Sequence, residues 1–141
     1  LVIGMFIVTQ LLLVLASRYR VALFAKRNDG RLFRDAINEG NGALAIRFAG
    51  FQIGAALAIS TAGKLVIFQD GSDALMSVAA WTIVAAVLLI AVILLTALTE
   101  KVILYGVPVE REVDREANYG VAAVEAGAYI GLGLLLVSLL G

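Results

Sequence analysis

The chain has no cysteine and no histidine among its 141 residues, and it has only one proline. The lack of cysteine excludes disulfides and thiol catalysis, and the lack of both residues removes the usual ligands of zinc and haem and the usual general base. The sequence also shows no Gly-rich phosphate loop, no metal-ligand cluster, no nucleophile beside a base and no paired buried carboxylates. We therefore expect no enzyme activity, no catalytic residues, no metal and no cofactor.

Charged residues are scarce as well, at 16%, while 62% of the residues are hydrophobic and the mean hydropathy is +0.99. A soluble domain of this length needs a mainly polar exterior, so this composition indicates that lipid is the solvent. Eleven basic residues balance eleven acidic ones. The net charge therefore gives no indication of a nucleic-acid partner.

Four apolar stretches, at residues 1–16, 42–63, 74–98 and 119–140, approach or reach the length of about 20 residues that a helix needs to cross a bilayer. Backbone groups cannot remain unpaired in lipid, so the spans are predicted to be helices. The first run does not begin with Met, and we expect it to continue upstream. It ends in "SRYR" without a small-residue cleavage site, which argues against a cleaved signal peptide.

The sequence repeats itself at an offset of 77 residues, which predicts two tandem units at 1–64 and 74–141. The segment 38–54 aligns with 114–131 through identical residues, among them Glu39 and Glu116, Asn41 and Asn118, Gly50 and Gly127, and Gly54 and Gly131. Each unit holds two spans, so both enter the membrane in the same direction. The fold class is therefore an all-α membrane protein of four transmembrane helices, built from two two-helix repeats in parallel orientation.

The basic residues predict the orientation of these spans. Nine of them lie in the stretches 17–40 and 99–118, and only Lys64 lies by the middle turn. We expect both charged stretches in the cytoplasm and both termini outside. The first charged stretch mixes apolar with basic residues, which suits contact with anionic lipid headgroups through simple anchoring or through specific docking of a lipid or protein.

The segments "EGNGALA" at Glu39–Ala45 and "EANYGVAA" at Glu116–Ala123 resemble a bacterial inner-membrane family, the YjfL-like proteins catalogued as domain of unknown function 350. The likeness covers nearly the whole chain, although Ala117 stands where the first copy has Gly40. The resemblance implies a four-helix inner-membrane protein with tandem repeats and implies no particular activity.

Asn41 and Asn118 begin the second and fourth spans, where an Asn side chain can cap the helix and the preceding Glu39 and Glu116 can favour its positive end. The alternative is that these four residues form a symmetric polar mouth that selects a cation.

Each unit also carries one Gly-x-x-x-Gly, at Gly50 and Gly54 and again at Gly127 and Gly131. Small residues allow close helix packing in lipid, so we expect the second and fourth spans to pack closely on each other or on neighbouring subunits.

Two charges, Arg47 and Glu125, lie inside spans. They are interpreted as a structural ion pair, with an ion or proton site at Glu125 and a headgroup contact by Arg47 as alternatives. The helical angles place Glu125 away from Gly127 and Gly131, which favours its contact with the first or third span or with another subunit.

Two functions are consistent with these features. The first is a structural, scaffold or accessory subunit that self-assembles or joins a larger membrane complex. The second is a small oligomeric channel or carrier for a cation or proton.

Overall fold

The computed structural model describes residues 2–66 and 74–141, and the described residues form helices without any strand. In chain order these are α1 (Val2–Arg27), α2 (Phe33–Asn38), α3 (Gly42–Leu65), α4 (Ala74–Ile103), α5 (Val109–Asp114) and α6 (Tyr119–Leu140). Four of them, α1, α3, α4 and α6, are long and apolar enough to cross a membrane. The prediction of an all-α membrane protein with four spanning helices is confirmed for these ranges.

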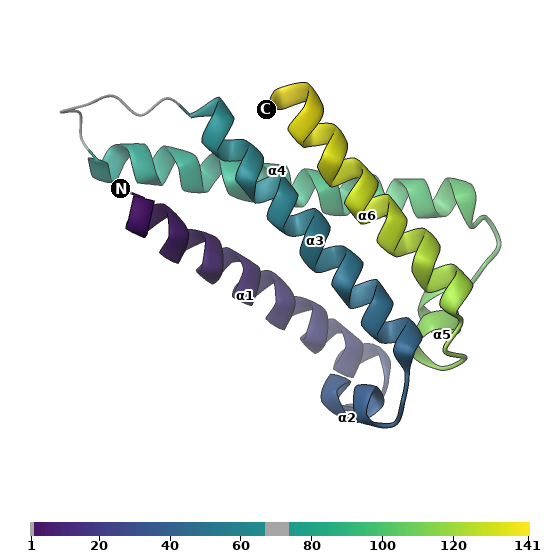
Figure 1. Ribbon diagram of the computed structural model, residues 1–141. Helices are drawn as coiled ribbons and strands as arrows, with labels where there is room; N and C mark the ends of the chain where they lie inside the picture. Colours follow the sequence, from purple (N-terminus) through teal and green to yellow (C-terminus); the bar gives the residue numbers. More distant parts are fainter. Residues whose placement is uncertain (1, 67–73) are drawn as a thin grey trace.

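Each half of the chain has the same order of elements, a long helix, a short helix and a second long helix. The long helices run back and forth along the bundle, so that α2 and α5 lie together at one end and both termini lie near the other (Figure 1). Position 42, where α3 begins, and position 119, where α6 begins, are separated by the offset of 77 residues.

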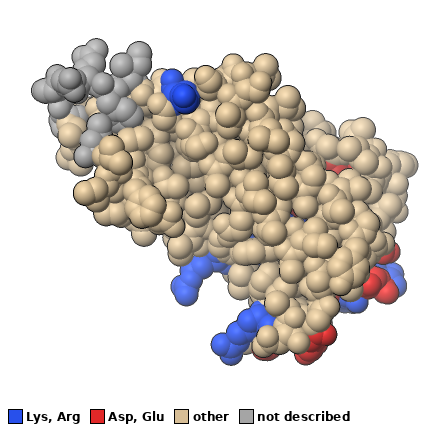
Figure 2. Space-filling view, in the orientation of Figure 1, with Lys and Arg blue, Asp and Glu red and all other residues tan. Residues whose placement is uncertain are grey.

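The end that holds α2 and α5 carries most of the charged atoms visible on the surface, and the long flanks are almost uncharged (Figure 2). Many large apolar side chains are exposed on these flanks, such as Phe6, Leu11 and Leu94. An apolar band of this kind suits the hydrocarbon core of a bilayer, in which exposed Leu, Ile and Phe carry no cost. The middle turn predicted at 64–73 lies largely outside the described residues.

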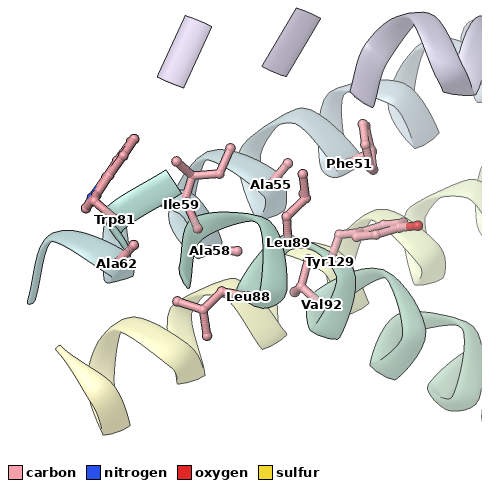
Figure 3. Close-up of a cluster of buried hydrophobic side chains, with 11 residues drawn as sticks. Phe51, Ala55, Ala58, Ile59, Ala62, Trp81, Leu88, Leu89, Val92 and Tyr129 are labelled. Carbon is pink, nitrogen blue, oxygen red and sulfur yellow. The ribbon is translucent and has the colours of Figure 1, made fainter. Parts of the chain in front are cut away.

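The main core lies where α3, α4 and α6 meet (Figure 3). Helix α3 packs most extensively against α6 and then against α4, whereas α1 makes fewer contacts. Small residues on α3 allow this close approach, since Ala55, Ala58 and Ala62 are fully buried. Larger side chains from the neighbouring helices fill the remaining space, among them Leu88, Val92 and Tyr129.

Helix α1 is longer than predicted. Residues 17–27 were predicted to belong to a connecting stretch, and they belong to this helix. It continues as a helix to Arg27 and ends at a turn in which Asp29 and Gly30 have positive φ. Residues 17–27 contain no Gly or Pro, and their basic residues are good helix formers, so nothing in this segment interrupts the helix. As a result, Arg20 and Arg27 project from α1 toward the end of the bundle that holds α5.

Candidate functional site

Both predicted cap residues stand at the start of a spanning helix and accept a hydrogen bond from the backbone. Asn41 Oδ1 accepts from Leu44 N at 3.0 Å, and Asn118 Oδ1 accepts from Val121 N at 3.2 Å. Asn41 also donates through Nδ2 to the carbonyl oxygens of Val113 at 3.0 Å and Asp114 at 3.2 Å. This side chain therefore fixes the start of α3 and ties the first half of the chain to the second.

The two glutamates before these caps pair with arginines at the surface. Glu39 is 65% exposed and pairs with Arg31, and Glu116 is 55% exposed and lies 3.8 Å from Arg111. The amide nitrogens of both asparagines donate to protein groups, since Asn118 Nδ2 donates to Glu112 Oε2 at 3.0 Å and Asn41 Nδ2 donates to the carbonyls of residues 113 and 114. One pocket is lined by Glu39 and Asn41, and neither Glu116 nor Asn118 lines it.

The first glycine pair lies in the contact between α3 and α6. A Cβ added to Gly50 would collide with Cα and Cβ of Ala126, and one added to Gly54 would lie 2.6 Å from the carbonyl oxygen of Tyr129. Helix α3 therefore presents bare backbone to α6, which permits the close approach expected of small residues in lipid.

The second glycine pair has different surroundings, so the two pairs do not form one seam. A Cβ on Gly127 or Gly131 would meet no atom within 4 Å. On the side of α6 that faces α3, Gly133 takes the tight position instead, because a Cβ added there would lie 3.1 Å from the carbonyl oxygen of Gly54. No residue in the ranges 2–66 and 74–141 therefore packs closely against Gly127 or Gly131.

The intramembrane charges Arg47 and Glu125 lie side by side, buried to 5% and 1% exposure. Arg47 Nε is 2.6 Å from Glu125 Oε2. The same guanidinium lies 3.4 Å from Glu110 Oε1 and 3.6 Å from Asp114 Oδ1, both on α5. Arg47 is thus held by three carboxylates from two helices.

Helix α1 supplies two further arginines to this site. Arg20 Nη2 lies 3.3 Å from Glu125 Oε1, and its Nη1 donates to the hydroxyl of Tyr129 at 3.1 Å. Its guanidinium carbon also lies 4.7 Å from the centre of the Phe51 ring, within cation–π distance. The second arginine, Arg27, pairs with the buried Asp114.

We call this set the charge cluster. It links α1, α3, α5 and α6 and consists of Arg20, Arg27, Arg47, Glu110, Asp114 and Glu125. Removing one partner of a buried ion pair costs about 3 to 5 kcal/mol of stability, because the other charge is left unpaired. Charges inside spanning helices therefore usually pair with one another. The cluster therefore holds four elements in one arrangement at the end of the bundle.

Glu100 near the end of α4 lies beside the charge cluster and contacts the carboxyl of Glu125. Its Oε1 is buried and has no hydrogen-bond partner, and Glu100 makes no ion pair with any described residue. Glu100 and Glu125 come from different helices, so only tertiary packing brings them together.

An open pocket of about 520 Å³ lies next to Glu100, between the end of α4 and the start of α5. Glu100, Lys101 and Glu110 contribute its charged side chains. Among residues 2–66 and 74–141, no three acidic side chains are grouped closely enough to hold a metal ion.

The family model described as Domain of Unknown Function (DUF350) matches residues 1–140. The chain belongs to this family. No curated protein and no solved structure matches it. The resemblance carried by the two Glu-x-Asn segments is thereby confirmed, and the DUF350 assignment itself brings no activity with it.

Sequence reasoning identified Arg47 and Glu125 of this DUF350 chain but missed the other members of the charge cluster. A signal was present for two of them, because Arg20 and Arg27 are seven residues apart, which places both on one face of a continuous helix. Glu110 and Asp114 lie in a short charged helix that carries no such sign.

Proposed function

We propose that this chain is a structural or accessory subunit of the bacterial inner membrane that assembles with further copies of itself through α6, and that it is not an enzyme. The observation that carries the proposal is the uncovered pair Gly127 and Gly131. Their counterparts on α3 are occupied by α6, yet no described residue occupies the pair on α6.

The small-residue surface extends along α6 beyond these two glycines. Gly120, Ala123 and Gly127 are exposed, and they are spaced three or four residues apart, as on one helix face. In lipid no hydrophobic force draws helices together, so association depends on such close backbone approach. A surface of this shape supports the packing of another helix, in the way that α3 packs within the chain.

The charged end of the bundle supports the proposed setting in the membrane. We place α2 and α5 in the cytoplasm, where their basic residues meet anionic headgroups, and both termini outside. The side chain of Arg34 is 81% exposed at this end, beside Asp35, and can reach such a headgroup.

The test compares two leucine variants in mild detergent and in membranes. Gly127→Leu, together with Gly131→Leu, is expected to shift the protein from oligomer to monomer while its helix content and melting temperature as a monomer stay unchanged. Leu134→Ala, on an exposed position of the same helix, is the control for a general change of the surface. An unchanged oligomer population in the double glycine variant, or a purely monomeric wild type, would contradict self-assembly.

A second candidate function is a small oligomeric carrier or channel for a cation or proton. The observation that favours it is the contact between Glu125, buried at membrane depth, and Glu100, which lines an open pocket. Ionisable residues within spanning helices often mark ion or proton paths. Proteoliposomes under an imposed potential test it, since Glu125→Gln should abolish any flux that the wild type carries.

A further inference from the structure

The charge cluster and Glu100 together contain three arginines and four carboxyl groups. If all seven groups were ionised, the site would carry one excess negative charge. Three of the carboxyl groups have arginine partners, since Glu125 pairs with Arg20 and Arg47, and Asp114 and Glu110 pair with arginines as well. Glu100 is the carboxyl group without one.

The position of Glu100 makes its ionised form unfavourable. One of its oxygens is buried without a hydrogen-bond partner, and the side chain contacts the carboxyl of Glu125. Two carboxylates in contact cannot both keep their charge at low cost, and such pairs hold one proton between them. Because Glu125 has two arginine partners, the proton belongs on Glu100.

The groups that face Glu100 come from every helix packed around it. Glu125 of α6 and Glu110 of α5 add negative charge around Glu100, and Arg47 of α3 opposes it. Tyr129 of α6 lies within electrostatic reach of Glu100 as well. Arg20 of α1 is directed to Glu125 and Tyr129, and Lys101 lies on the pocket side of α4. No basic residue among these forms an ion pair with Glu100.

We propose that Glu100 is a proton-binding residue whose carboxyl O–H donates a hydrogen bond to Glu125 and exchanges its proton with water in the pocket between α4 and α5. This inference goes beyond assembly through α6, and it holds whether or not protons cross the membrane. Release of the proton passes H⁺ to pocket water and leaves two like charges in contact. The contact between α4 and α6 then weakens, so the fold loses stability as the pH rises.

Infrared spectroscopy of the wild-type protein in lipid nanodiscs tests the proposal directly. A protonated carboxyl gives a C=O band that moves on exchange into D₂O and disappears when the proton is lost. We expect this band at neutral pH in the wild type, its loss in Glu100→Gln, and its persistence in Glu110→Gln, which changes an exposed carboxyl in the same pocket. A wild type without the band, or a band that survives in Glu100→Gln, would overturn the proposal.

Melting temperatures provide an independent measurement. The Gln amide can donate a hydrogen bond to Glu125 as the protonated acid does. The melting temperature of Glu100→Gln should therefore equal that of the wild type at neutral pH, and it should not fall at higher pH as that of the wild type does. If Glu100→Gln fails to fold, Glu100→Asp serves instead, because it keeps an acid whose band shifts in frequency. A band that stays unshifted in Glu100→Asp, or equal pH profiles for wild type and Glu100→Gln, would count against a proton on Glu100.

Discussion

Nε of Arg47 and Oε2 of Glu125 lie 2.6 Å apart, and these two residues stand near the starts of different spanning helices, α3 and α6. At a rise of about 1.5 Å per residue, each of the two residues lies about 10 Å or less along its helix from the helix start. The pair therefore joins the two halves of the chain near one end of the bundle. The remaining partners are unequal, because Arg47 has two further carboxylates and Glu125 has one further arginine.

This inequality predicts unequal costs for the two single changes. Arg47→Met should lower the free energy of unfolding by about 3 kcal/mol, since it leaves an excess of buried negative charge around Glu125 and Asp114. Glu125→Gln should cost less, because Arg47 keeps Glu110 and Asp114. Unfolding of each variant by a denaturing detergent measures both values.

The double variant is the control for the pair itself. Arg47→Met with Glu125→Gln should be more stable than the sum of the single losses implies, since the burial cost disappears together with the attraction. Strict additivity of the two losses would show that the short contact carries no coupling energy.

The glycines predict a contrast between two alanine variants. Gly50→Ala should lower the melting temperature of the monomer by several degrees, because its methyl group would collide with backbone and Cβ atoms of Ala126. Gly127→Ala should leave the monomer unchanged, because its Cβ would meet no atom within 4 Å. Thermal unfolding in a detergent that keeps the protein monomeric compares them, and equal effects at both positions would contradict the described packing.

Gly40 and Ala117 predict a second contrast, which depends on the backbone alone. They occupy equivalent places in the two halves, and both have positive φ, 93° for Gly40 and 50° for Ala117. A left-handed conformation costs a residue with a Cβ about 1 to 2 kcal/mol. Ala117→Gly should therefore stabilise the fold by about 1 kcal/mol, and Gly40→Ala should destabilise it by a similar amount.

Denaturant unfolding of both variants checks the sign of each change. A Cβ on Gly40 would meet no atom within 4 Å, so a loss of stability in Gly40→Ala reports backbone strain and no collision. The idea fails if Ala117→Gly destabilises the protein.

The spanning helices were predictable because the apolar runs and the asparagines at positions 41 and 118 are local signals. The bounds of α6 agree with the predicted stretch 119–140, and α3 differs only by two residues at its end. The end of α1 was not predicted, because the apolar run stops at residue 16 and charged residues follow it. The helix nevertheless continues through this charged segment to Arg27.

The candidate site was harder to predict, because its geometry depends on which helices become neighbours. The offset of 77 residues places Phe48 opposite Glu125 and Val124 opposite Arg47, so the repeat gives no symmetric partner for either charge. Glu100 has no local feature that distinguishes it from a solvated residue at a helix end. Its contact with Glu125 depends on the packing of α4 against α6, which no spacing within either helix determines.

The orientation in the membrane predicts which end of the bundle a reagent reaches from outside the cell. The chain has no cysteine, so single cysteines report their positions without background. We choose Arg34→Cys, on α2 at the charged end, and Lys64→Cys, an exposed position at the other end of α3. An impermeant thiol reagent applied to intact cells should label position 64 and leave position 34 unlabelled.

The physical reason is the excess of Lys and Arg at the end that holds α2 and α5, because segments rich in these residues stay on the cytoplasmic side during insertion. Permeabilised cells provide the control, since both positions should then react, and failure at position 34 there would indicate a blocked thiol. Labelling of position 34 alone on intact cells would reverse the topology. It would also move the pocket beside Glu100 to the outer face, where its proton would equilibrate with the exterior.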